Sequence, residues 1–255
     1  MFNIEEFDIK LDTDHFGRNF VYVEEVNSTN NFLMQTKEYQ KHGTVLLAEN
    51  QTEGKGRLDR TWTSSKEQNL TFSILLTEGI NAANINIINL ASSLSVAQSI
   101  ENLYQLNVEL KWPNDVLIDK KKAAGILLES TSKGSKLERV IIGIGLNVNQ
   151  PSFPGKFNIT PTSIRLELKR NVSREKLLSE LLNNFEENIK ILEHAPDKIL
   201  SDWKNRCKLL GEKIKIAAGE TTKFGIFEDI DEQGFLILKT QNGKEKIHFG
   251  DMSLR

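Results

Sequence analysis

Apolar and polar residues follow two different periods along the chain, and the change of period divides it. Up to about residue 208, short apolar runs of strand length alternate with longer segments whose apolar residues recur every three or four positions. From Gly211 the period becomes two, in four short stretches separated by turns that include Asn242-Gly243. The pattern predicts strands covered by helices, followed by a small closed or nearly closed β-barrel.

The individual elements follow from the same periods. In the first part we predict strands at residues 20–23, 44–48, 69–77, 108–111, 116–118, 123–129 and 140–149, and helices at about 31–40, 84–104, 173–193 and 197–208. In the second part the predicted strands are residues 213–216, 223–228, 235–238 and 246–249. Three of the five prolines lie in residues 150–161, which we predict to be a loop.

Composition excludes several classes of protein. A formal net charge of −2 argues against a dedicated nucleic-acid binder, which needs a strongly basic face. Cys207 is the only cysteine, so the chain can form neither an internal disulfide nor a cysteine-based zinc site. The acidic N-terminus lacks the features of a signal peptide, and no apolar run is long enough to span a membrane. We therefore expect a soluble cytoplasmic protein.

The segment from Glu49 to Trp62 leaves a buried strand and has no apolar period. Gly54 and Gly56 allow the backbone to approach a ligand closely, while lysine and arginine between and after them supply donors for an anion. It matches neither a P-loop nor a dinucleotide fingerprint. Two interpretations stay open at this point: a loop that orders around a phosphate or carboxylate, and a solvated surface turn.

Two further turns carry polar residues where strands end. Ser28 and Thr29 precede a helix, where they can cap its first turn or bind a polar ligand beside the free N–H groups. Pro113 interrupts the strand pattern beside Lys111, Asn114 and Asp115, and we predict a break or bulge there with the strand resuming beyond it. Asn114 and Asp115 fit an ordinary turn equally well.

The next two strands carry small residues. Residues 119–122 form a charged hairpin tip whose lysines we expect to be mostly solvated. Ala123, Ala124 and Gly125 follow and indicate close packing of a ligand or another backbone, and alternation places Gly143, Gly145 and Asn147 on one face of the next strand.

These motifs occur together in an order that resembles the biotin–protein ligase family. The matching segments are Ser-Thr-Asn (28–30), the glycine-rich loop, Lys-Trp-Pro-Asn-Asp (111–115), Ala-Gly-Ile-Leu (124–127), Gly-x-Gly-x-Asn-x-Asn (143–149) and the final Gly-Asp-Met-Ser-Leu-Arg (250–255). The resemblance covers most of the chain. It implies an α+β fold, with a mixed β-sheet catalytic domain flanked by helices in residues 1–208 and a small SH3-like β-barrel in residues 209–255.

The implied activity is ATP-dependent ligation in two steps. The carboxylate of biotin attacks the α-phosphorus of ATP to give biotinyl-5′-AMP and pyrophosphate, and a lysine amine of a biotin carboxyl carrier protein, or of the biotinyl domain of a carboxylase, then attacks the mixed anhydride. No nucleophilic side chain is needed, because the substrates make the bonds. The protein must hold two anions together and stabilise charge on the α-phosphate.

The resemblance also implies roles for individual residues. The biotin-binding set is Ser28, Thr29, Asn30, Gln51, Lys55, Gly56, Arg57, Lys111 and Gly125. The nucleotide-binding set is Lys55, Arg57, Arg60, Trp62, Asn114 and Asn147, with Lys111 and Arg57 as the catalytic residues. Mg²⁺ would arrive with ATP, near Asn147, without a fixed site made of protein ligands alone. Trp62 is a lid hinge, an adenine-stacking residue or a core residue.

Two positions depart from the family pattern. Lys55 stands where arginine is frequent, which keeps the charge but loses bidentate geometry. Asp59 occupies a position that is often glycine, and aspartate tolerates positive φ better than most residues. Only about 20 residues precede the first strand, too few for a DNA-binding module such as some family members carry, so we expect no DNA binding.

Two other functions stay open. A lipoate–protein ligase would share the fold and the adenylate chemistry, although the glycine-rich loop and the Lys-Trp-Pro-Asn-Asp turn match the biotin branch. A non-catalytic module that binds a carrier protein or nucleic acid through the barrel and the lysine-rich tip is the alternative of another class. Homodimerisation through an exposed edge of the catalytic sheet is possible.

Overall fold

The computed structural model describes residues 1–134, 136–219 and 221–254. Most of the chain forms a seven-stranded sheet in the order β1-β2-β3-β7-β6-β5-β4, in which β1 and β2 are parallel and the other neighbours antiparallel. The sheet is therefore mixed, as the sequence predicts. Its strands are β1 (Phe20–Val26), β2 (Val45–Gln51), β3 (Leu70–Leu76), β4 (Val108–Lys111), β5 (Asp115–Ile118), β6 (Lys121–Lys133) and β7 (Lys136–Leu146).

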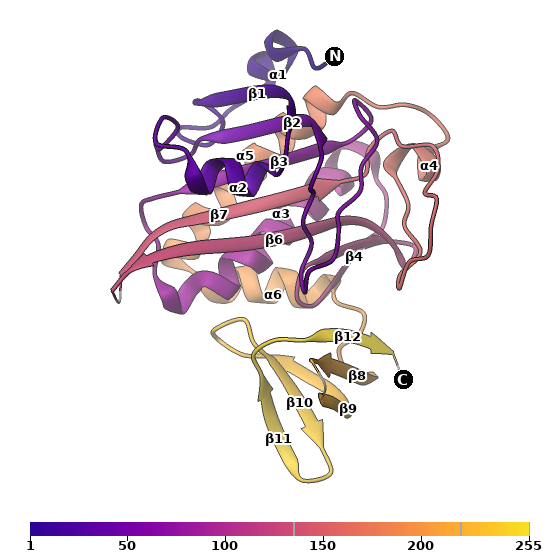
Figure 1. The fold of residues 1–255 in the computed structure, drawn as a ribbon. Coiled ribbons are helices and arrows are strands. Elements are labelled where there is room, and N and C mark those ends of the chain that lie inside the picture. Colours follow the sequence, from indigo (N-terminus) through magenta and orange to yellow (C-terminus); the bar gives the residue numbers. More distant parts are fainter. Residues whose placement is uncertain (135, 220, 255) are drawn as a thin grey trace.

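Helices cover both faces of this sheet (Figure 1). They are α1 (Ile4–Lys10), α2 (Thr29–Gln35), the 3₁₀-helix η1 (Ala82–Asn84), α3 (Ile85–Tyr104), α4 (Ile164–Leu168), α5 (Arg174–His194) and α6 (Pro196–Arg206). The long helices α3 and α5 pack together over the main core, whereas α2 lies on the opposite face above a small cluster that contains Leu33, Leu46, Leu75 and Ile141. No helix within the described ranges is long and apolar enough to cross a membrane.

The sequence predicts the long elements well and the short ones less well. Helices α3, α5 and α6 are confirmed, while α1, α4 and β12 are missing from the prediction. Helix α2 starts at Thr29 and ends at Gln35, not at residues 31 and 40. It begins early because the Ser28 side chain caps its first turn, and it ends early because Thr36 is extended.

The turn at Pro113 differs from the expectation. Strands β4 and β5 pair antiparallel, with Lys111 opposite Asp115, so the chain reverses at Trp112-Pro113-Asn114 and does not continue in the same direction. The prediction that a strand resumes beyond a break is wrong in direction. The hairpin brings Lys111 and Asp115 to the same end of the sheet.

The C-terminal region is an antiparallel sheet of five strands in the order β11-β10-β9-β8-β12. Its strands are β8 (Lys213–Ala218), β9 (Thr221–Ile230), β10 (Leu236–Thr240), β11 (Gly243–Ile247) and β12 (Asp251–Leu254). The edge strands β11 and β12 share no ladder among the residues described, so of the predicted closed or nearly closed barrel the closed form is wrong. Figure 1 shows the β10–β11 hairpin pointing away from the large sheet and β12 lying toward it.

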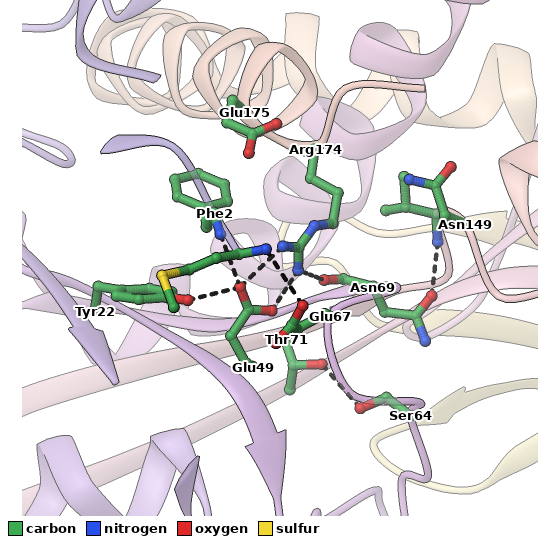
Figure 2. A network of polar contacts seen from close by, with 12 residues as sticks. Phe2, Tyr22, Glu49, Ser64, Glu67, Asn69, Thr71, Asn149, Arg174 and Glu175 are labelled. Carbon is green, nitrogen blue, oxygen red and sulfur yellow. Dashed lines mark hydrogen bonds and ion pairs between the residues drawn. The ribbon is translucent and has the colours of Figure 1, made fainter. Parts of the chain in front are cut away.

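A buried ion pair joins α5 to the sheet. Both guanidinium nitrogens of Arg174 donate to Glu49, at 2.5 and 2.9 Å, and Glu49 also accepts from the Tyr22 hydroxyl and the Phe2 backbone N–H. Figure 2 shows these groups converging on the Glu49 carboxylate, with Asn69 beyond. Arg174 and Tyr22 hold the pKa of Glu49 below its usual value although burial opposes the shift. The network fixes the strand that ends at Gln51.

Candidate functional site

The N-terminal end of α2 places three polar side chains behind the surface of the sheet. Ser28, Thr29 and Asn30 are 2%, 3% and 3% exposed, because α2 lies directly on β3 and β7. The backbone N–H of Thr29 donates to Gln51 Oε1 at 2.8 Å, which joins the helix end to the end of β2. Capping and ligand binding are therefore compatible: Ser28 caps the helix and also lines a cavity.

The glycine-rich segment is an ordered hairpin. Gly56 N–H donates to Arg60 O at 2.7 Å, and Trp62 N–H donates to Gly54 O at 2.9 Å. Leu58 and Asp59 form its tip with φ of 54° and 56°, so position 59 does require positive φ. These backbone hydrogen bonds join the two arms of the loop.

The arginines of this hairpin contact the C-terminal sheet. Arg57 donates to Asn114 Oδ1 and to Gly250 O, both at 3.3 Å, and lies 3.6 Å from the Asp251 carboxylate. Arg60 also pairs with Asp251. Burial lowers the pKa of Arg57, and Asp115 partly opposes that shift. The hairpin thus contacts both the β4–β5 turn and the C-terminal region.

The lysine-rich tip contradicts the expectation of solvated side chains. Lys121 and Lys122 lie in β6, and only residues 119 and 120 form the turn. Lys122 Nζ is 2.5 Å from Asp115 Oδ1 and 5.7 Å from the centre of the Trp62 ring. Lys121 pairs with Glu167 at 2.6 Å. A bulge between Val116 and Leu117 shifts the register of β6, so simple alternation misplaces both lysines.

Lys111 lies behind Asp115. Its Nζ is 3.8 Å from Asp115 Oδ2, and its side chain is 13% exposed. Burial lowers the pKa of Lys111, Asp115 raises it in part, and the charges of Lys122 and Arg60 lower it further. Asp115 is therefore shared by two lysines, one of which is close to Arg60.

Two glycines of β7 form the floor of the site. Any side chain at Gly145 would collide with the Trp62 ring, and any side chain at Gly143 would collide with the Asn30 carboxamide. The prediction that these glycines share one face of the strand is confirmed. Because neither has a side chain, Trp62 and Asn30 can lie directly against the sheet. Trp62 is half-buried on this floor and is not part of the core.

These features surround one cavity of about 630 Å³. Of the thirteen predicted site residues, twelve line it: Ser28, Thr29, Asn30, Gln51, Lys55, Gly56, Arg57, Arg60, Trp62, Asn114, Gly125 and Asn147. Lys111 does not belong to the lining. The cavity has a neutral polar end at the start of α2 and a cationic end between the glycine-rich hairpin and β6.

The sequence analysis missed three parts of the lining. These are Lys122 and Asp115, residues 153–159 of the proline-rich loop, and Asp251 of β12. Among three consecutive lysines nothing in the sequence distinguishes Lys122. Phe153 and Phe157 in a loop of polar residues were a usable signal, because an apolar side chain in a loop is commonly present to cover something.

Asn147 is the candidate ligand for a metal ion. It lines the cavity and is 3% exposed, its Nδ2 donates to Thr162 O at 3.0 Å, and its buried Oδ1 has no hydrogen-bond partner among the described residues. A carboxamide oxygen suits Mg²⁺. No cluster of three acidic, histidine or cysteine side chains occurs in the described part of the chain, so the residues fit an ion held largely by its own phosphate ligands.

Two family models match this chain. Residues 22–147 match the biotin/lipoate A/B protein ligase family, and residues 209–255 match the biotin protein ligase C-terminal domain. The first match spans α2, the glycine-rich hairpin, both lysines and the two glycines of β7.

Relatives of known activity are similar over most of their length. The chain is 30% identical over 248 residues to a bifunctional ligase/repressor of Bacillus spizizenii, which covers 96% of this chain and 76% of that protein. It is 31% identical over 219 residues to the biotin–[acetyl-CoA-carboxylase] ligase of Mycobacterium tuberculosis, covering 82% and 78% of the two chains.

A solved structure gives the same result. The biotin protein ligase of Aquifex aeolicus in complex with biotin and ATP superposes with a TM-score of 0.82, at 32% identity, over 93% of this chain and 99% of that one. Sequence, fold and the order of the motifs around the cavity therefore agree. The chain belongs to the biotin protein ligase family.

Proposed function

We propose that this protein activates biotin with ATP as biotinyl-5′-AMP and transfers the biotinyl group to a lysine of a biotin carboxyl carrier protein or carboxylase biotinyl domain. The observation that carries the proposal is the two-ended cavity. A neutral polar end suits the ureido ring of biotin, and an end with more cations than carboxylates suits two anions that repel each other.

The neutral end binds the ring of biotin. Ser28, Thr29, Asn30 and Gln51 supply the polar groups there, and Asn30 and Trp62 lie against Gly143 and Gly145 on the floor beneath. A ring held in this way directs the valeryl chain of biotin, with its terminal carboxylate, toward Lys122 and Arg57. Gly125 also lines the cavity, and its lack of a side chain lets Trp62 and Lys122 lie close to the strand.

The cationic end brings the reacting groups together. Lys122 contacts the biotin carboxylate and the α-phosphate, and Arg57, Lys55 and Arg60 close over the phosphates from the hairpin. Lys111 lies outside the cavity and pairs with Asp115. Its positive charge weakens the ion pair between Asp115 and Lys122, which leaves Lys122 freer to bind substrate. One biotin carboxylate oxygen bonds to the α-phosphorus as the bond to the bridging oxygen breaks, and pyrophosphate leaves.

The second step needs no protein nucleophile. The carrier lysine, as a neutral amine, attacks the carbonyl carbon of biotinyl-5′-AMP, AMP departs with the electron pair, and the nitrogen loses a proton to give an amide. Lys122 and Arg57 stabilise the leaving phosphate. Trp62 and the loop of residues 153–159 enclose the adenylate and keep water from hydrolysing it.

Mg²⁺ would be bound with the triphosphate, with Asn147 Oδ1 as its protein ligand. When bound, the ion neutralises charge on the phosphate oxygens. Thr162 contributes by accepting from the Asn147 amide nitrogen, which leaves the amide oxygen for the ion. Asn114, which contacts Arg57, positions that arginine beside the nucleotide.

Several expectations from the sequence stay predictions. They are the division of labour between residues 1–208 and 209–255, dimerisation through an edge of the large sheet, the absence of DNA binding and localisation in the cytoplasm. The edge strands of the large sheet are β1 and β4. Size measurement in solution tests the dimer, and a filter-binding assay tests DNA.

Exchange of radiolabelled pyrophosphate into ATP tests the proposal. We expect exchange that depends on biotin, followed by biotinylation of an added carrier domain. Exchange that required lipoate and ignored biotin would assign the chain to the lipoate branch. Salt-sensitive DNA binding without any ATP turnover would instead support a non-catalytic module.

A further inference from the structure

A chain of polar contacts lies behind the neutral end of the cavity. Asn30 Nδ2 is 2.7 Å from Glu129 Oε2, Ser73 Oγ is 2.6 Å from Asn30 Oδ1, and Thr29 Oγ1 is 2.7 Å from Ser73 Oγ. Ser73 is fully buried, and Thr29 and Asn30 are 3% exposed. Thr29 and Asn30 line the cavity, whereas Ser73 and Glu129 do not. The chain therefore links a carboxylate outside the cavity to a hydroxyl inside it.

The direction of the first link is fixed by chemistry. The Glu129 carboxylate and the Leu127 carbonyl, 3.2 Å from Asn30 Nδ2, can only accept hydrogen bonds. The amide nitrogen of Asn30 must therefore face them, and its oxygen must face Ser73. If the amide were inverted, Asn30 Oδ1 would face the Glu129 carboxylate and the Leu127 carbonyl, and both contacts would pair two acceptors.

The hydroxyl protons follow from that orientation. Asn30 Oδ1 takes the single proton of Ser73, so Ser73 Oγ can serve Thr29 only as an acceptor. Thr29 then gives its own proton to Ser73, because donation to Gln51 Oε1 at 3.0 Å instead would leave the Ser73 and Thr29 oxygens 2.7 Å apart with no proton between them. In this arrangement the proton of Thr29 lies between the two hydroxyls, and Thr29 Oγ1 can only accept a hydrogen bond from a ligand.

We propose that Glu129 is a positioning residue that makes Thr29 an obligatory hydrogen-bond acceptor, so that the site selects a ring that has an N–H at that point. The inference rests on the proposed function and adds the basis of its selectivity: a cyclic urea binds, and a ring with oxygen in place of that N–H meets two opposed acceptors. Such a mismatch costs about tenfold to a hundredfold in affinity.

A double substitution tests the direction of the chain. Asn30→Asp places two carboxylates together and should weaken biotin binding about tenfold or more. Glu129→Gln alone should change little, because the glutamine oxygen can still accept from Asn30. In the double variant the glutamine nitrogen donates to the introduced aspartate, which still accepts from Ser73, and biotin affinity should recover most of the loss. Calorimetry with biotin and, separately, with ATP gives the readout, and ATP affinity should stay constant.

The matched control is Asn30→Asp with Glu138→Gln, which removes an exposed carboxylate from the adjacent strand β7. It should not restore biotin binding. Equal rescue by both double variants, or rescue by neither, would overturn the proposal. If the original protein binds no biotin at all, the proposed function and this inference fall together; failed rescue in a protein that binds biotin removes this inference alone.

Ser73→Ala provides a test without an added charge. It removes the hydroxyl that accepts the Thr29 proton, which can then turn to the cavity as well as to Gln51 Oε1. The preference for biotin over two cyclic carbamate analogues, each with one ring N–H replaced by oxygen, should therefore shrink for one analogue. Ser92→Ala is the control, because Ser92 is equally buried in α3 and donates to Ile88 O. An equal loss of affinity for biotin and both analogues would contradict the inference.

Discussion

Two groups of charged residues in this protein have opposite balances. Around Glu49 one buried carboxylate meets one guanidinium, and the Tyr22 hydroxyl and a backbone N–H satisfy its remaining lone pairs. Around Asp115 and Asp251 two carboxylates face Lys111, Lys122, Arg57 and Arg60. In the first group one cation balances one carboxylate. In the second group four cations outnumber two carboxylates.

The difference separates structure from function. A satisfied buried pair stabilises a fold only while both partners are present. A cluster with excess cations beside a cavity costs the free protein some repulsion, which a bound anion relieves. Charge balance, more than burial, therefore indicates where an anionic ligand binds.

The largest effect on stability should come from the balanced pair. Glu49→Gln leaves Arg174 buried without its carboxylate and should lower the free energy of unfolding by about 3–5 kcal/mol, with pyrophosphate exchange retained in the folded fraction. Urea denaturation measures it. Glu67→Gln, in the exposed pair with the N-terminal amine, is the control and should change stability by under about 1 kcal/mol. Equal effects of the two variants would contradict the comparison.

The largest effect on activity should come from the cluster with excess cations. Lys122→Ala should reduce biotin-dependent pyrophosphate exchange by about 10²–10³-fold, because a donor to the reacting carboxylate and phosphate is lost, while the unfolding midpoint stays close to that of the original protein. Lys111→Ala should also remove most of the pyrophosphate exchange, but the fold-reduction should be smaller than in Lys122→Ala. Lys120→Ala, at the exposed turn, should leave exchange intact. Normal exchange in Lys122→Ala would remove that residue from the mechanism.

Glu186 extends the comparison to acid stability. Burial alone would raise its pKa, but backbone N–H groups of Asp14, His15 and Phe16 and the Lys190 ammonium lower it from 4.5 to about 2. Its contribution, about 3 kcal/mol, is complete above the unfolded pKa of 4.5 and is lost as the pH falls toward 2. Glu186→Gln should therefore be less stable than the original protein at pH 7, with the difference shrinking between pH 5 and 2. A constant difference across urea titrations at these pH values would refute it.

The smallest effect expected concerns retention of the intermediate. Arg57→Gly removes the cation that joins the hairpin to Asn114 and to β12, so biotinyl-5′-AMP should escape into solution about tenfold more. Chromatography of filtered reactions quantifies the released adenylate. Arg18→Gly, an exposed arginine near the N-terminus, is a control that should release no more than the original protein. Unchanged release from Arg57→Gly would show that Arg57 does not retain the intermediate.

The sequence predicts what local patterns decide. The amphipathic period of residues 173–193 gives α5 within a residue or two, and glycine and turn residues locate the hairpins. Twelve cavity residues follow from motifs that match a family, because each motif lies on the same loop or strand end as the chemistry it serves.

Strand register and contacts between residues far apart in the chain could not be predicted from the sequence. The bulge in β5–β6 determines which lysine of three enters the cavity, and no local pattern marks it. Asp251 reaches the glycine-rich hairpin from the C-terminal sheet, about 190 positions later in the chain. The open C-terminal sheet has the same origin, since alternation predicts strands but not whether the two edge strands meet.

Thermal unfolding with biotin, with ATP, with both and with neither tests most directly whether one cavity unites the two substrates. Because the adenylate should bind far more tightly than either precursor, both together should raise the midpoint by much more than the sum of the separate shifts. Shifts that merely add, or no shift with either substrate, would contradict the account.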